Sequence, residues 1–209
     1  MLTLRNFSKG YNGQLVLEVG QLSFEKGVYW IKGENGSGKT TLFKSIAGIL
    51  PFVGDISFSD GISQKSNPVA YRKRISYSEA EPLYPGFLTA KDLVRFIGKI
   101  KGGSLDQQEK YCRSLGVDAF LDKPTETYSS GMMKKLALAL AFLGEPQLII
   151  LDEPLITLDE HTRAVVFELI REKLALRVTF LISSHHSITA HELAVERTFL
   201  LENKNIHTL

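Results

Sequence analysis

Residues 33–41 have the residue types and spacing of a loop that binds a phosphate chain. Gly33, Gly38, Lys39 and Thr40 occupy the fixed positions of the pattern G-x-x-x-x-G-K-[ST]. Glycines let the backbone curl so that successive N–H groups face a phosphate, and a following helix adds the positive end of its dipole. Lys39 can supply a cation to the β- and γ-phosphates, and the Thr40 hydroxyl can bind Mg²⁺. This loop therefore predicts binding of a nucleoside triphosphate with Mg²⁺.

A carboxylate pair, Asp152-Glu153, directly follows an apolar segment far downstream. Carboxyl ends of parallel strands meet at one sheet edge, so Asp152 is expected beside the glycine loop, holding Mg²⁺ directly or through water. Glu153 would lie at the strand's mouth, where it can polarise an attacking water as general base. The alternative is that both acids cap the helix near Asp159 or face solvent. With the loop, the pair predicts hydrolysis of the bound triphosphate.

The segments around these residues alternate between strand and helix patterns. Continuous apolar strands are predicted at 27–32, 147–151 and 178–182, and helices at 41–49, 133–143 and from 159 to about 174. This alternation indicates an α/β fold with a mostly parallel central sheet. Residues 2–7 and 15–24 alternate between apolar and polar instead, which favours a small antiparallel sheet beside it.

The remaining segments are shorter. Strands are predicted at 54–58, 74–77, 197–201 and 205–209, helices at 90–101 and 105–114, and loops at 59–66 and 79–89.

Composition and charge place limits on the function. With 44% hydrophobic and 23% charged residues, the chain has the composition of an ordinary globular domain, and a net charge of +2 gives no reason to expect nucleic acid or an anionic membrane as a partner. The single cysteine, Cys112, is expected to be a small apolar packing residue of a protein in a reducing compartment. The longest apolar stretch, residues 136–143, is far below the roughly 20 residues that span a bilayer, and the N-terminal residues do not have the basic-then-apolar pattern expected of a signal segment.

Five segments, in order, resemble the ATP-binding cassette subunit of an ABC transporter, and the resemblance covers nearly the whole chain. They are GENGSGKTTL at 33–42 (Walker A), YSSGM at 128–132 (the signature, commonly LSGGQ), LIILDEP at 148–154 (Walker B), Leu158-Asp159 (the D-loop) and Ser183-Ser184-His185 (the switch loop). The resemblance implies a phosphate-loop NTPase fold with a mostly parallel central sheet, a small antiparallel β subdomain and a helical subdomain. Residues 1–209 would form one domain, with an ATP-binding core at about 1–79 and 132–209 and the helical subdomain at about 80–131.

The resemblance also implies roles for individual residues. Two such domains join head to tail with ATP between them, so Ser129 and Gly131 would contact the γ-phosphate bound by the partner subunit's Lys39. Tyr11 would stack on adenine, although spacing alone favours packing for this ring. His185 would contact the γ-phosphate and steady the attacking water. The implied sets are Glu153, His185 and Lys39 for catalysis, Thr40 and Asp152 for Mg²⁺, and Tyr11, Asn35, Gly36, Ser37, Gly38, Lys39, Thr40, Thr41, Ser129 and Gly131 for ATP.

The implied partners are a transmembrane permease and a second ATPase subunit, in a homodimer or heterodimer, without nucleic acid. The chain would then be cytoplasmic and peripheral on the inner face of the membrane. The sequence LYPGFLTAKDL at 83–93 resembles that of exporters more than that of importers. Residues 81–96 are a candidate docking segment for the permease, unless their apolar side chains pack within the helical lobe. Two other hypotheses are a degenerate subunit beside an active paralogue and a soluble ABC ATPase without a transport role.

Three departures from the family pattern predict slow turnover. Ala80 stands where a glutamine is usual, and Glu79 or Glu81 could replace its contact with the metal. Ser130 and Met132 replace a glycine and a glutamine of the signature. Ile156-Thr157 precedes the D-loop aspartate where smaller residues are more common.

Overall fold

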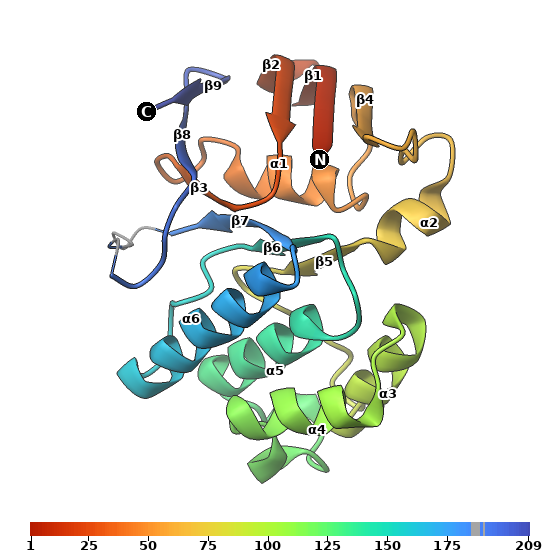
Figure 1. The fold of residues 1–209 in the computed structure, drawn as a ribbon, viewed down its shortest axis with the longest axis vertical. Helices are drawn as coiled ribbons and strands as arrows, with labels where there is room; N and C mark the ends of the chain where they lie inside the picture. The colour runs from red at the N-terminus through yellow and green to blue at the C-terminus, as the bar shows by residue number, and fades with distance from the viewer. Residues whose placement is uncertain (185–188, 190) are drawn as a thin grey trace.

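The computed structural model describes residues 1–184, 189 and 191–209, arranged in layers (Figure 1). A three-stranded sheet lies above helix α1, and α1 lies above most of a six-stranded central sheet, whose strands within residues 197–208 rise beside the helix. The remaining long helices lie on the opposite side of the central sheet from α1. The predicted α/β fold with a small antiparallel part and a helical part is confirmed.

The central sheet is parallel except at one edge. In spatial order it consists of β5 (Ile75–Ser78), β6 (Leu148–Leu151), β7 (Thr179–Ser183), β3 (Val28–Lys32), β8 (Arg197–Glu202) and β9 (Asn205–Thr208). Only β8 and β9 pair antiparallel among these strands. The inner strands β6 and β7 are buried along their whole length, as continuous apolar strands require.

The small sheet is antiparallel, with the order β2 (Gln14–Phe24), β1 (Leu2–Tyr11) and β4 (Val53–Phe58). Leu4 on β1 lies opposite Leu22 on β2 and Ile56 on β4, so apolar side chains line the face toward α1. The predicted strands are confirmed, but β1 extends to Tyr11. The shorter prediction failed because Lys9 and Gly10 resemble a turn, whereas the strand continues through a register shift between them.

Six α-helices are described; the first and the fifth start two and three residues before their predicted positions, and the second was not predicted. They are α1 (Lys39–Ile46), α2 (Pro68–Lys73), α3 (Ala90–Lys101), α4 (Leu105–Ser114), α5 (Ser130–Phe142) and α6 (Glu160–Ala175). Helix α1 was expected at 41–49, but it begins two residues earlier because the glycine loop leads directly into it. Helix α2 was not predicted: Asn67 caps it by accepting a hydrogen bond from Ala70 N, and proline occupies its first turn.

Two apolar clusters cover the two faces of the central sheet. One lies between the sheets and contains Leu42, Phe43 and Ile46 of α1. The other contains side chains of α3, α4, α5 and α6. Helix α5 lies in the middle of this second layer, and residues 136–142 are buried on every side of it, which explains its nearly continuous apolar sequence.

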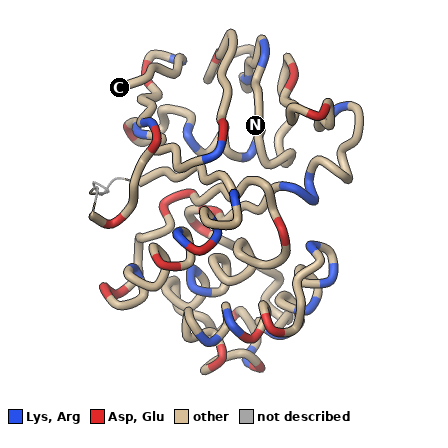
Figure 2. Tube along the Cα trace, in the orientation of Figure 1, with Lys and Arg blue, Asp and Glu red and all other residues tan. Residues whose placement is uncertain are grey.

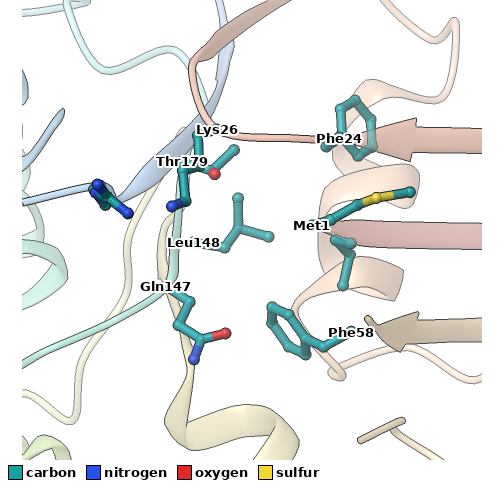
Figure 3. Close-up of a pocket in the computed structure, with 9 residues that line it drawn as sticks. Met1, Phe24, Lys26, Phe58, Gln147, Leu148 and Thr179 are labelled. Atoms are coloured by element: carbon teal, nitrogen blue, oxygen red, sulfur yellow. The ribbon is translucent and has the colours of Figure 1, made fainter. Parts of the chain in front are cut away.

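A cavity of about 300 Å³ opens at the amino ends of β6 and β7 (Figure 3). Phe24 and Phe58 of the small sheet line it on one side, and Leu148 and Thr179 line it on the other. Ligands of open parallel sheets bind at the carboxyl ends of the strands. This cavity is therefore a gap where the two sheets meet, at the opposite edge from the phosphate loop.

Charge and burial agree with the composition. Lys and Arg are interleaved with Asp and Glu over most of the trace (Figure 2). Cys112 is buried, and burial raises the pKa of its thiol to about 11, so it is an unreactive packing residue as expected. Among the described helices, none is both long enough and apolar enough to cross a membrane.

Replacing Phe43 by alanine should lower the free energy of unfolding by about 3–5 kcal/mol, because the ring is fully buried between the two sheets. The matched control is Val69→Ala on the exposed face of α2, with an expected change below about 0.5 kcal/mol. Guanidinium unfolding of both variants measures the difference. Equal shifts would show that α1 does not organise this core.

Candidate functional site

The glycine loop connects the carboxyl end of β3 to the start of α1, the strand–loop–helix arrangement that its sequence predicted. Gly33 has no room for a side chain, since a Cβ there would lie 2.5 Å from Ser37 Oγ and 2.7 Å from the Leu201 carbonyl oxygen. Gly38, immediately before the helix, has a φ of 105°, which favours glycine. Both glycines are therefore needed for the path of the loop.

Lys39 lies across the inside of this loop. Its Nζ donates hydrogen bonds to the carbonyl oxygens of Gly33 at 2.6 Å and Glu34 at 3.0 Å. Burial lowers the pKa of Lys39, and the nearby carboxylates of Asp152 and Glu153 oppose that shift. The ammonium group is thus held over the loop, where it can meet an anionic group bound there.

Asp152 is the centre of the polar contacts at the site. Its side chain is only 1% exposed, and it accepts hydrogen bonds on both oxygens. Thr40 Oγ1 donates to Oδ2 at 2.7 Å, and Ser183 Oγ donates to Oδ1 at 2.6 Å. The Tyr77 hydroxyl lies 3.3 Å from Oδ2 and donates to it more weakly. The structure thus brings Asp152 beside Thr40, as the sequence predicted.

Ser183 and Tyr77 were not among the predicted site residues. Ser183 ends β7 and accepts a hydrogen bond from Glu153 N at 2.9 Å while donating to Asp152. Tyr77 is on β5, and burial followed by the charge of Asp152 raises the pKa of its hydroxyl, which keeps the hydroxyl protonated and able to donate. The sequence did contain a signal for both residues. Each is a polar residue near the carboxyl end of an apolar strand that lies next to β6.

Glu153 is buried and has a φ of 47°, a left-handed conformation that is costly for a residue with a side chain. Its burial, and that of Asp152, rules out the alternative that the two acids face solvent. They do not cap the next helix either, because Asp159 caps α6 by accepting a hydrogen bond from Thr162 N at 2.8 Å. The carboxylate pair therefore belongs to the site.

A cavity of about 390 Å³ joins these groups. Its described lining residues are Val16, Asn35, Gly36, Ser37, Gly38, Lys39, Thr40, Thr41, Ala80, Asp152 and Glu153. The loop residues predicted to bind ATP, from Asn35 to Thr41, all line it, whereas Gly33 and Glu34 do not. Val16 on β2 was missed, since an apolar strand residue does not by its type suggest a binding role.

The residues at this cavity fit a magnesium–triphosphate group. Ser37 Oγ is buried and has no hydrogen-bond partner among the described residues, so an acceptor or donor from a ligand would satisfy it. One hydroxyl and one carboxylate, on Thr40 and Asp152, lie together at the cavity. Nowhere in the described part of the chain do three His, Cys, Asp or Glu residues form a metal cluster, so the ion needs oxygens from phosphate and water.

Ala80 lines the cavity, so the methyl group is at the predicted place of the missing glutamine. The carboxylate of Glu79 forms an ion pair with Lys44 at 2.7 Å, and Glu81 is exposed. Neither is among the lining residues of the cavity. Neither the Glu79 carboxylate nor the Glu81 carboxylate therefore occupies the position expected for the glutamine side chain.

The signature residues lie at the start of α5, where Ser129 Oγ accepts a hydrogen bond from Met132 N at 3.2 Å. Ser129 and Gly131 are not among the residues that line the phosphate-loop cavity. A Cβ on Gly131 would lie 3.2 Å from the Thr157 carbonyl oxygen, so the signature and the D-loop approach closely within one chain. Met132 packs against the apolar cluster, which suits methionine better than glutamine.

Tyr11 has an exposed ring, with 44% of its surface accessible, so the interpretation of Tyr11 as a packing residue is wrong. Lys9 Nζ lies 4.5 Å from the ring centroid, and the ring is not part of the cavity lining. Adenine stacking on Tyr11 stays a prediction. His185 lies outside the described residues, so its role also stays a prediction.

Comparisons with known proteins agree with this geometry. Residues 20–156 match the family model for ABC transporters. The chain is 31% identical over 210 residues to the ABC transporter ATP-binding protein YtrB of Bacillus subtilis, covering 99% of this chain and 70% of that protein. It is 30% identical over 204 residues to the cytochrome c biogenesis ATP-binding export protein CcmA of Legionella pneumophila, covering 96% and 100%. A third relative is the spermidine/putrescine import ATP-binding protein PotA of Spiroplasma citri, 32% identical over 88% of this chain, which spans only 54% of PotA.

The solved structures have the same fold. A structure of the ATP-binding subunit of an ABC transporter superposes with a TM-score of 0.89 at 28% identity, covering 100% of this chain and 90% of the other. A dimeric ATP-binding cassette with bound ADP and Pi gives 0.84 at 19% identity, covering 100% and 99%, and supports the fold alone. The chain therefore belongs to the ABC transporter family, in which it is an ATP-binding and ATP-hydrolysing domain.

Proposed function

We propose that this chain binds Mg-ATP and hydrolyses it to drive a separate transmembrane permease of the exporter type. The observation that carries the proposal is the contact of Thr40 and Asp152 at 2.7 Å, directly beside the phosphate loop and Glu153. These are the groups needed to hold a metal–triphosphate complex and activate water, and they line one cavity.

Each residue has a distinct task in this mechanism. The loop N–H groups and Lys39 bind the phosphates, and Thr40 with Asp152 would hold Mg²⁺, which would supply positive charge to the phosphate oxygens. Ser183 orients the Asp152 carboxylate and the Glu153 backbone through its two hydrogen bonds. Glu153 accepts a proton from the attacking water as the water oxygen bonds to the γ-phosphorus. The bond from that phosphorus to the β–γ bridging oxygen breaks, and ADP leaves in line with the attack.

The site is completed by a second chain in a head-to-tail dimer. The support within this chain is that Ser129 and Gly131 stand at a helix start outside the chain's own cavity, where they can meet an anion held by another subunit. Adenine stacks on Tyr11, whose ring is exposed for such a contact. The partner is a second copy or a related ATPase subunit.

The permease binds the lobe that contains residues 81–96. Leu83 and Phe87 are 89% and 79% exposed there, whereas Tyr84 and Leu88 pack against the core. The segment thus combines a packed side with an apolar side open to a partner. Export is favoured by the sequence at 83–93, and relatives named for export and for import both occur, CcmA and PotA among them. Docking through this segment would place the chain on the cytoplasmic face of the membrane.

Replacing Glu153 by glutamine should reduce ATP hydrolysis by about 10²- to 10⁴-fold, because the amide cannot accept a proton, while ATP binding is preserved. The control is Glu160→Gln, the same change at an exposed position on α6, which should leave turnover unchanged. Phosphate release and equilibrium nucleotide binding are measured side by side. Unchanged turnover of the Glu153 variant would mean that another group is the base.

Replacing Lys39 by alanine should weaken ATP binding and ATP-dependent dimerisation together by about 10- to 100-fold, the effect of losing a charged hydrogen bond to phosphate. Lys91→Ala, at an exposed lysine on α3, is the control. Titration with a fluorescent ATP analogue and light scattering report the two properties. Loss of binding without loss of dimerisation would contradict the sandwiched site.

The permease partnership is tested by purifying the tagged chain from detergent extracts. A hydrophobic multi-spanning protein whose presence stimulates ATP hydrolysis is the expected partner. A ribosomal or DNA-bound partner without a membrane protein would instead support the soluble ATPase hypothesis.

A second candidate function is that of a degenerate subunit beside an active paralogue, and Ala80 at the cavity favours it. This candidate predicts a purified homodimer without ATPase activity, and activity that appears when a second cassette is added. Hydrolysis by the homodimer alone excludes it.

A further inference from the structure

Lys134, on helix α5, is buried to 2% exposure and donates hydrogen bonds to three carbonyl oxygens at the edge of the ATP site. Its Nζ lies 2.8 Å from the Glu79 oxygen, 2.7 Å from the Ala80 oxygen and 3.3 Å from the Asp152 oxygen. An ammonium group has three donors, so this set of carbonyls uses all of them. The contacts join one helix to the ends of two strands, β5 and β6.

Lys134 has residues of two different nucleotide sites on its two sides. Ala80 and Asp152 line the cavity of the chain's own phosphate loop. Ser129, little more than one helical turn before Lys134 on α5, is the residue assigned to the partner's nucleotide. Lys134 therefore lies between the chain's own half of one ATP site and the half that it offers to the other.

Burial of a lysine is costly unless a specific contact requires it. Burial lowers the pKa of Lys134 to about 8, although the carboxylates of Asp152, Glu153 and Glu81 oppose the shift. The Glu79 and Ala80 carbonyls lie beyond the end of β5, so the parallel ladder with β6 no longer provides them with partners. A hydrophobic side chain at position 134 would leave these carbonyls without their donor.

We propose that Lys134 is a positioning residue that holds α5 and its signature end in register with the chain's own ATP site. Binding of ATP at the phosphate loop would then place Ser129 and Gly131 for the partner, because residues 79–80, Asp152 and α5 move as one unit. The inference rests on the head-to-tail dimer of the proposed function. It also explains how this chain keeps residue 80 in contact with α5. The backbone carbonyl of Ala80 accepts the hydrogen bond from Lys134, whereas the methyl side chain of Ala80 cannot form a polar contact.

Lys101 provides a matched control at the other end of β5. It is on α3, and its Nζ donates to the carbonyl oxygens of Arg72, at 2.7 Å, and Ile75. Burial lowers its pKa to about 8, as it does for Lys134. The two lysines have the same chemistry at opposite ends of one strand, but the carbonyls that Lys101 contacts are not part of the cavity lining.

The experiment compares Lys134→Met, Lys134→Arg and Lys101→Met in a Glu153→Gln background, which retains ATP. Binding of a fluorescent ATP analogue to the monomer should stay within about threefold of the parent in every variant, whereas Lys134→Met should need about tenfold more ATP to dimerise. Lys101→Met should lose comparable thermal stability and dimerise as the parent does. Lys134→Arg, which keeps the charge and the donors, should recover part of the dimerisation.

The outcomes separate this inference from the proposed function. If the Glu153→Gln parent binds ATP but does not dimerise, the proposed dimer is wrong, and the inference is wrong with it. If the parent dimerises and Lys134→Met dimerises equally well, or no worse than Lys101→Met, the inference alone is wrong. Should Lys134→Met fail to fold, Lys134→Gln takes its place with the same expected split between binding and dimerisation.

Discussion

The site depends on one buried carboxylate, that of Asp152. Transfer of an ionised carboxylate out of water is costly unless hydrogen bonds replace the lost hydration. Thr40 from α1 and Ser183 from β7 supply those bonds at 2.7 and 2.6 Å, one to each oxygen. The same bonds connect β6 to the helix after the phosphate loop and to the neighbouring strand. A single group therefore fixes the relative positions of the three elements that surround the phosphates.

This contact is possible because α1 is packed between two sheets. Apolar side chains of α1 face both the small antiparallel sheet and the central sheet, so the helix can neither tilt nor slide without opening the core. Its N-terminus is thereby held at the carboxyl edge of β3, which lies beside β7. Packing energy at one end of α1 stabilises the precise polar geometry at the other.

The sequence predicts the parts of the site that depend on local spacing, and it misses those that depend on strand register. The glycine loop and Asp152-Glu153 are recognisable because their residue types and neighbours are sufficient to define them. Ser183 lies beside Asp152 only because Leu151 pairs with Ile182, and Lys134 reaches the Ala80 carbonyl only because α5 packs beneath β5. No local pattern determines such pairings, since they arise from packing between segments far apart in the chain.

The departures from the family pattern surround the site without entering its central contacts. Met132 packs against the core, Thr157 presents its backbone to Gly131, and Ala80 gives the cavity a methyl group in place of an amide. Thr40, Asp152, Ser183 and Glu153 form their contacts without help from any of these three positions. Ser130 and Met132 belong to the signature, the segment that the resemblance assigns to the partner's nucleotide, whereas Ala80 lines the chain's own cavity. The hydrogen bonds that hold Asp152 therefore do not depend on the altered residues, whichever nucleotide those residues adjoin.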